Sequence, residues 1–189
     1  MRRSIENRPI KNSLPNSFSY CSELDMVKEL VYDECGFELK NLKIHPEGKA
    51  YGACSFELNG LTIDHRLAKI TPKKTGQFVA IWKRNKSGET EPYDINDDLD
   101  YLIITVKSGH NLGQFIFPKS VLAEKQIITK NGIEGKLGIR VYPPWDSVTN
   151  NQAEKTQSWQ TKFFVNISDK ESIDFDLAKK LITITNKQF

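Results

Sequence analysis

Cations that close or interrupt apolar runs are the residues of this sequence best placed to do chemistry. Two stretches open with Gly-Gln-Phe, continue as aromatic-rich apolar runs and close on cations, Lys83 and Arg84 in 76–84 and Lys119 in 113–119. A third apolar run contains Arg140. Such runs predict buried strands, and an isolated cation is costly to leave unpaired in a core. If the strands are adjacent, we expect Lys83, Lys119 and Arg140 to converge on one anion-binding site.

The cationic positions also have aromatic neighbours, such as Trp82, Phe117 and Tyr142. A basic groove with interleaved rings suits DNA or nucleotides, because cations hold phosphates and bases stack on rings. For any single lysine, a strand-capping role with its stem over apolar surface is the favoured alternative. For Trp145, packing of the indole on the sheet is favoured over contact with a ligand. The residues predicted to bind phosphate or ligand are Arg66, Lys69, Lys83, Gln114, Arg140 and Trp145.

A carboxylate and a guanidinium lie close together in the sequence, at Asp64 and Arg66. They follow Asn59-Gly60, which is the strongest hairpin signal of the chain. At positions i and i+2 of a strand, both side chains share one face and could line a cleft. We favour the interpretation that they form a solvent-exposed pair that contributes little.

The elements that must position these residues indicate one α+β domain. We expect a mixed or mainly antiparallel sheet of about six to seven strands, with an N-terminal helix and C-terminal helices packed on one face. Residues 1–20 lack periodicity and predict a flexible arm, and residues 21–189 form the domain. Expected strands cover 51–58, 61–71, 77–84, 101–107, 112–117 and 136–142, and expected helices cover 22–35, one or two turns within 118–126, 151–161 and a segment beginning at 173.

Composition limits the class of protein. The chain has 189 residues, with 27 Lys and Arg against 24 Asp and Glu. The net charge of +3 falls short of a dedicated nucleic-acid coat protein, so any basic surface must be local. Three cysteines without metal-ligand spacing, no long apolar run and no signal-peptide pattern predict a soluble cytoplasmic protein that does not enter a membrane.

Several strings of uncommon residues occur in an order that resembles the MepB family of bacterial proteins. The similarity extends from about residue 22 to 164. The strings are Leu-Ala-Lys-Ile-Thr-Pro-Lys-Lys-Thr-Gly-Gln-Phe-Val at 67–79, Trp-Lys-Arg at 82–84, Gly-Gln-Phe-Ile-Phe-Pro-Lys at 113–119, Arg-Val-Tyr-Pro-Pro-Trp at 140–145 and Gln-Ser-Trp-Gln at 157–160. The resemblance implies a poorly defined role, with a distant likeness to restriction-endonuclease-like nucleases and a part in handling DNA or nucleotide analogues.

That likeness implies a metal-dependent site. Such enzymes hold a divalent ion with an Asp at the start of one strand and a Glu, Asp or Gln two residues before a Lys on the next. Asp98 and Asp100 precede an apolar strand, and Lys119 ends the following one. Phe117 occupies the position two before Lys119, and Gln114 reaches the face of Lys119 only across a bulge. The expected catalytic residues are Asp98, Asp100 and Lys119, with both aspartates as ligands of Mg²⁺.

Three functions fit these patterns. The first is a metal-dependent nuclease-like protein, or one that acts on nucleic acid or nucleotides, with a cationic phosphate-binding cleft. The second is a non-catalytic binding module for a small anionic ligand linked to drug response. The third is a structural or interaction protein. Binding that needs no magnesium would favour the second over the first.

Overall fold

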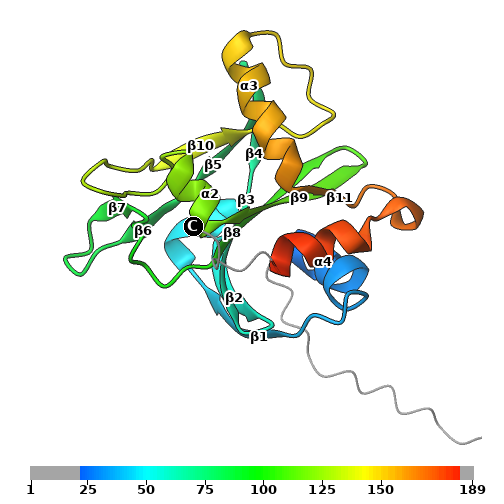
Figure 1. Ribbon diagram of the computed structural model, residues 1–189, viewed down its shortest axis with the longest axis horizontal. Coiled ribbons are helices and arrows are strands. Elements are labelled where there is room, and N and C mark those ends of the chain that lie inside the picture. Colours follow the sequence, from blue (N-terminus) through cyan, green and yellow to red (C-terminus); the bar gives the residue numbers. More distant parts are fainter. Residues whose placement is uncertain (1–21, 184–189) are drawn as a thin grey trace, which may run out of the picture.

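The computed structural model describes residues 22–183, and a six-stranded mixed sheet forms its centre (Figure 1). The strand order is β1-β2-β3-β8-β9-β11. The arm predicted for residues 1–20 lies outside the described residues. The strands are β1 (Leu39–Ile44), β2 (Cys54–Leu58), β3 (Leu61–Leu67), β8 (Tyr101–Ser108), β9 (Asn111–Pro118) and β11 (Phe164–Asn166).

The hairpin of β2 and β3 forms where the sequence predicts it. Asn59 and Gly60 have φ values of 51° and 78°, the left-handed backbone that a two-residue hairpin turn requires. This turn pairs Leu58 with Leu61 and sets Asp64 opposite Ser55. On its other side β3 runs parallel to β8, whereas the remaining neighbours in this sheet are antiparallel. The predicted mixed sheet is therefore confirmed.

Residues 68–100 connect the parallel neighbours β3 and β8 and carry four short strands. These are β4 (Lys69–Thr71), β5 (Lys74–Ala80), β6 (Trp82–Arg84) and β7 (Thr90–Pro92). With β10 (Gly138–Val141), β4 and β5 form a three-stranded sheet of order β10-β5-β4, whereas β6 and β7 form a separate hairpin. The strand predicted for 77–84 therefore divides at Ile81, whose N–H donates to the carbonyl of Leu137.

Helices cover both faces of the main sheet (Figure 1). On one face lie α1 (Ser22–Val27), the π-helical turn η1 (Lys28–Tyr32) that continues it, and α4 (Phe175–Thr183). On the other lie α2 (Lys119–Glu124), α3 (Asn151–Gln160) and the three-stranded sheet. The 3-10 turns are η2 (Pro46–Tyr51), η3 (Thr161–Phe163) and η4 (Lys170–Ser172). The expectation that all helices pack on one face is wrong.

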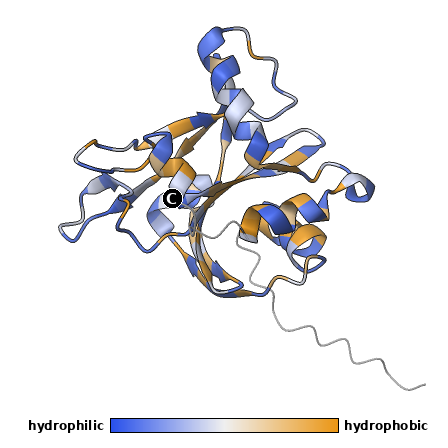
Figure 2. Ribbon diagram, viewed as in Figure 1, coloured by the Kyte–Doolittle hydropathy of each residue, from blue (hydrophilic) through white to orange (hydrophobic). Residues whose placement is uncertain are grey.

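Strand β8 shows why other elements must cover both faces of the main sheet. Its residues Tyr101 and Ile103 point into the core beneath α1 and α4, and Leu102 and Ile104 point into the core beneath α2 and α3. A strand that is apolar on both faces is stable only between two layers. Figure 2 shows the corresponding hydrophobic colouring along the central strands and on the helix faces that turn toward them. Within residues 22–183, no helix has the length and apolar character needed to cross a bilayer.

Candidate functional site

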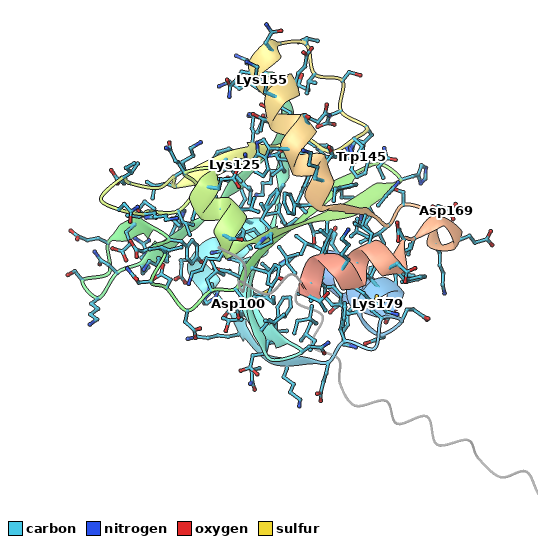
Figure 3. All side chains as sticks on the ribbon, in the orientation of Figure 1. Asp100, Lys125, Trp145, Lys155, Asp169 and Lys179 are labelled. Carbon is cyan, nitrogen blue, oxygen red and sulfur yellow. The ribbon has the colours of Figure 1, made fainter. Side chains whose placement is uncertain are left out.

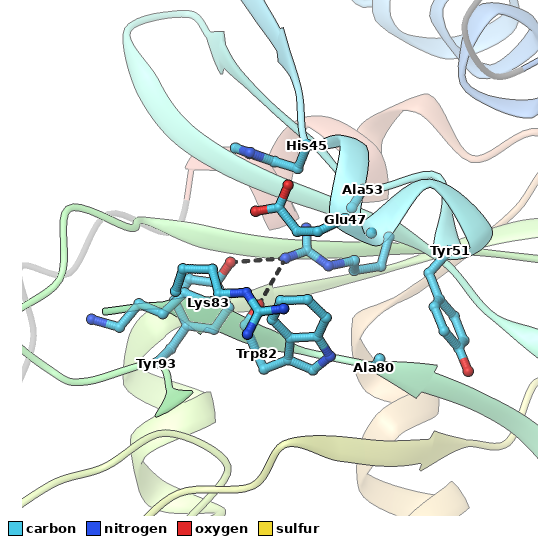
Figure 4. A pocket seen from close by; sticks show the side chains of 11 residues that line it. His45, Glu47, Tyr51, Ala53, Ala80, Trp82, Lys83 and Tyr93 are labelled. Carbon is cyan, nitrogen blue, oxygen red and sulfur yellow. Dashed lines mark hydrogen bonds between the residues drawn. The ribbon is translucent and has the colours of Figure 1, made fainter. Parts of the chain in front are cut away.

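A cavity of about 230 Å³ lies between η2, the end of β3 and the β6–β7 hairpin (Figure 4). From the η2 side, His45, Glu47 and Tyr51 line it. Figure 4 shows these residues along one side of the cavity, with Trp82 and Tyr93 from the hairpin side facing them. The walls therefore come from segments on either side of β3 in the sequence.

Arg66 lines the cavity and forms a buried ion pair with Asp64. Each side chain is 7% exposed. The guanidinium contacts both carboxylate oxygens through its two terminal nitrogens, and it also donates to the carbonyl of His65 and to the hydroxyl of Tyr93, 2.9 Å away. A longer contact of 3.4 Å reaches the carbonyl of Trp82. These contacts offset the cost of burying the charge and hold the guanidinium in one orientation.

Two hydrogen-bond donors remain at this position. The Nε–H of Arg66 has no hydrogen-bond partner among residues 22–183. The Tyr93 hydroxyl accepts from Arg66, which leaves its own proton available. Both residues line the cavity. A charged N–H beside an O–H is an arrangement that can donate to two oxygens of a phosphate or carboxylate.

The rim combines cations with aromatic rings. The Arg84 guanidinium lies 4.8 Å from the centre of the Trp82 ring and donates to the hydroxyl of Thr90. Lys83 also lines the cavity, but its ammonium pairs with Glu91 at 3.1 Å and with Asp97 at 2.5 Å. The charge that the rim presents to a ligand therefore comes more from Arg84 than from Lys83.

His45 lies on the η2 side, and its Nε2 is 3.1 Å from the hydroxyl of Ser55. Burial raises the pKa of Asp64, the register partner of Ser55, while the charges of Arg66 and His45 act in the opposite direction. For Lys83, burial lowers the pKa, but hydrogen bonds to Asp97 and Glu91 outweigh it and the net shift is upward. The cavity therefore keeps its lysine protonated.

The predicted convergence of Lys83, Lys119 and Arg140 is only partly realised. Lys83 and Lys119 both reach Asp97, Lys83 through the carboxylate and Lys119 through the backbone carbonyl at 2.5 Å. Neither Lys119 nor Arg140 lines the cavity, because Lys119 begins α2 and β10 joins the smaller sheet. Arg140 donates to the carbonyl of Gly76 at 2.9 Å. The expectation of one shared site for all three cations is wrong.

The two predicted metal ligands meet at Thr62. The Asp100 carboxylate accepts from its N–H at 2.8 Å, and the Asp98 carboxylate accepts from its hydroxyl at 3.4 Å. Within the described part of the chain, no three or more His, Cys, Asp or Glu side chains cluster with the geometry of a metal site. The pair offers Mg²⁺ carboxylate oxygens, with water and substrate needed to complete the coordination.

Two other predicted ligand-binding residues belong to the interior. Gln114 is 1% exposed and accepts a hydrogen bond from the Tyr32 hydroxyl at 2.8 Å. The ring of Trp145 packs edge-on against Phe164, with 5.5 Å between centroids, at the second core. Neither lines the cavity, since β9 directs Gln114 toward the α1 side of the sheet and Trp145 covers the opposite side. In Figure 3, Trp145 lies near α3, well separated from Asp100.

The sequence interpretation of Asp64 and Arg66 as an exposed pair is also wrong, since each residue is 5% exposed. The i, i+2 spacing of Asp64 and Arg66 did correctly predict that their side chains meet on one face of the strand. Their burial follows from the central place of β3 between β2 and β8. Tyr93 and His45 were missed because each lies outside a strand and has no patterned neighbour.

The family model described as MepB-like matches residues 45–166. The chain belongs to the MepB-like family. A solved structure described as the crystal structure of MepB is similar to this chain at 37% sequence identity, with a TM-score of 0.67 over 69% of this chain and 88% of that one. No curated protein matches. The MepB-like match contains every residue that lines the cavity and leaves α1 and α4 outside it.

Proposed function

We propose that this MepB-like protein binds a phosphorylated ligand with a planar ring, of the nucleotide class, in the cavity beside Arg66. The observation that supports it most is the buried guanidinium whose Nε–H has no partner among residues 22–183. Asp64 already stabilises the charge, so a ligand does not have to offset its burial. An anion would meet a donor fixed in position before binding.

The aromatic side chains account for the ring of the ligand. Trp82 and Tyr51 line the cavity on its two sides, and bases stack on such rings with little dependence on sequence. Among the charged lining residues, Arg66, Lys83 and Arg84 are cationic and Glu47 is acidic. The balance favours an anion, and Glu47 can accept a hydrogen bond from an amino group.

The size of the cavity limits what enters. At about 230 Å³ it is smaller than the ~300–1,000 Å³ that is usual for pockets enclosing a whole drug-sized ligand. One phosphate with part of a sugar or ring fits this volume better than a complete dinucleotide. The cavity therefore suits one end of a larger ligand.

Calorimetric titration with thymidine monophosphate and with inorganic phosphate, each with and without Mg²⁺, tests the proposal. Arg66→Lys keeps the charge beside Asp64 but removes the Nε–H, and Tyr93→Phe removes only the hydroxyl. We expect each to weaken binding about 5-fold or more, as loss of one hydrogen bond predicts. Lys125→Gln, at the C-terminal end of α2 beside Trp159 and outside the cavity lining, is the matched control. Equal affinity of all three variants would reject the cavity as the site.

Metal-dependent cleavage of nucleic acid is a second candidate. Asp64 stands two residues before Arg66 on a central strand, which is the carboxylate-to-cation spacing of restriction-endonuclease-like sites with Arg in place of Lys. Asp98 and Asp100 are the other possible ligands, with Lys119 nearby through Asp97. If magnesium-dependent degradation of DNA is lost in Asp64→Asn, the cleavage site is the cavity. If it is lost in Asp98→Ala and in Lys119→Ala, the cleavage site is the pair of carboxylates beside Thr62.

A further inference from the structure

A hollow lies along α2, apart from the cavity beside Arg66. Its volume is about 660 Å³, within the ~300–1,000 Å³ that is usual for cavities enclosing a small molecule. The lining residues come from the loop after β7, from α2 and from the segment that follows α2, and they are Ile95, Lys119, Ser120, Val121, Ala123, Glu124 and Lys130. None of them lines the cavity beside Arg66. A ligand of the α2 hollow would therefore be recognised independently of the proposed function.

The apolar part of the α2 hollow is held in place by the fold. Ile95 packs against the core beneath α2 and α3, and Ala123 is a buried member of that core. The Ile95 N–H donates to the carbonyl of Thr129 at 2.9 Å, and the Thr129 N–H donates to the carbonyl of Tyr93 at 2.8 Å. These hydrogen bonds fix the loop after β7 against the segment that follows α2. The hollow is thus formed before a ligand enters, which lowers the cost of binding.

Two ammonium groups line the α2 hollow without a carboxylate partner in residues 22–183. Lys130 forms no ion pair in that range, and the Lys119 ammonium donates only to the backbone carbonyl of Asp97, at 2.5 Å. Two N–H groups of Lys119 are therefore available to a ligand. The acidic lining residue is Glu124, and its carboxylate pairs at 2.7 Å with Lys125, which does not line the hollow. The charges of the lining favour an anion.

The Ser120 hydroxyl adds a neutral donor, because it has no hydrogen-bond partner in the described part of the chain. Ammonium and hydroxyl groups beside an apolar lining suit a carboxylate that is attached to a hydrocarbon chain or ring. A small inorganic anion would leave the apolar part of the lining in contact with water. We propose that the α2 hollow binds a small amphipathic carboxylate, with its charged group toward Lys119 and Lys130 and its hydrocarbon part against Ile95 and Val121.

Calorimetric titration with octanoate, octanol and acetate separates the two parts of this ligand. Octanoate has the chain and the charge, octanol has only the chain, and acetate has only the charge. We expect octanoate to bind at least about 10-fold more tightly than either of the others. Each buried methylene contributes about 4-fold in affinity, and a hydrogen bond to a charged group contributes about 10-fold.

Substitutions in the lining test the two parts separately. Lys119→Gln with Lys130→Gln keeps a donor at each position but removes both charges, so it should weaken octanoate about 10-fold and leave octanol unchanged. Val121→Asp places a carboxylate in the lining and should weaken both. Lys179→Gln with Lys180→Gln on α4 removes the same charge on the other face of the main sheet and should have no effect (Figure 3).

Nitrogen–proton correlation NMR spectra show where octanoate binds. We expect saturable shifts of the amide signals of Ile95, Val121 and Lys130, whereas the indole N–H of Trp82, in the cavity beside Arg66, should not move. The inference is overturned if octanol binds as tightly as octanoate, if the change at the two lysines acts no more than the α4 control, or if Trp82 shifts and Val121 does not.

Failure of this inference and failure of the proposed function give different results. Absence of saturable octanoate binding overturns the α2 hollow as a ligand site, whatever thymidine monophosphate does. Absence of monophosphate binding, with octanoate binding that depends on Lys119 and Lys130, rejects the cavity beside Arg66 and supports the α2 hollow.

Discussion

His65 links three strands of the main sheet through hydrogen bonds that require a neutral imidazole. Its Nδ1 is 3.2 Å from the carbonyl of Gly52, which can only accept, so Nδ1 carries the proton. Its Nε2 then accepts from the hydroxyl of Thr105 at 2.9 Å, and that hydroxyl accepts from Gln114. Burial lowers the pKa of His65 to about 4. A proton on Nε2 would take away the acceptor that the buried Thr105 hydroxyl proton has in this arrangement.

Stability should therefore decrease on acidification. Unfolded His65 takes up a proton near pH 6.5 and the folded residue only near 4, so the unfolded state binds more protons between these values. The free energy of unfolding should fall by up to about 3 kcal/mol as the pH drops through this window. Urea unfolding at several pH values measures it. His65→Gln, which keeps a donor and an acceptor, should flatten the curve, and an unchanged slope would contradict the assignment.

Strand β9 meets β11 at a glycine that leaves space for a ring. An added Cβ at Gly113 would lie 2.2 Å from the Phe164 ring and 2.9 Å from the carbonyl of Val165. Gly113 lies opposite Asn166 in the register, so β11 can approach only because this side chain is absent. The Gly-Gln-Phe repeat thus serves packing here, and Gly76 likewise faces Tyr142.

Gly113→Ala should destabilise the protein by about 1–3 kcal/mol, because the Phe164 ring must move within a packed core. Thermal and urea unfolding measure the loss. Phe164→Leu relieves the contact, so the double variant should be less destabilised than the sum of the two single changes. Strict additivity would show that Phe164 is not the cause.

Elements were predictable where the pattern is local. The Asn59-Gly60 turn, the apolar strand at 101–107 and the helix at 151–161 follow from turn chemistry and periodicity. The break at Ile81 does not, because it depends on a hydrogen bond to Leu137 far along the chain. The same holds for the distribution of helices over two faces, which depends on the partners of β8 and not on β8 itself.

At the scale of the molecule, residues 22–183 form two cores that share one sheet. Strands β8 and β9 contribute residues to both, since Ile103 and Ile116 face α1 and α4 while Ile104 and Phe117 face the opposite side. Removing either layer would expose half of these strands. The two sides should therefore unfold together.

We expect two spectroscopic probes to report the same unfolding transition in urea. The three tryptophans, Trp82, Trp145 and Trp159, belong to the cavity wall or to the second core, so fluorescence reports on that side. Far-UV circular dichroism reports on both sides. We expect equal urea midpoints from the two probes, as two-state unfolding requires. A fluorescence transition that precedes the loss of helix signal would show that α1 and α4 fold separately.

The candidate site was harder to predict than the fold. Arg66 and Lys83 were expected at a ligand site and do line the cavity. The buried contacts of Arg66 with Asp64 and Tyr93 were not expected. Asp64 is buried because β3 pairs with β8, and these two strands are separated in the sequence by residues 68–100. Arg140 was grouped with them on the assumption that the strands carrying Lys83, Lys119 and Arg140 lie side by side. Strand β10 does pair with β5, but β9 belongs to the other sheet.

Parallel pairing of β3 and β8 has a consequence for how such a protein can diversify. That pairing fixes the position of Arg66 in the cavity, whereas much of the remaining cavity wall comes from the connecting segment 68–100. The free-energy cost of closing a connection between two strands rises only slowly as the connection becomes longer. Relatives can therefore differ in this segment, and with it in most of the cavity wall, while Arg66 and Asp64 stay in the same place on β3.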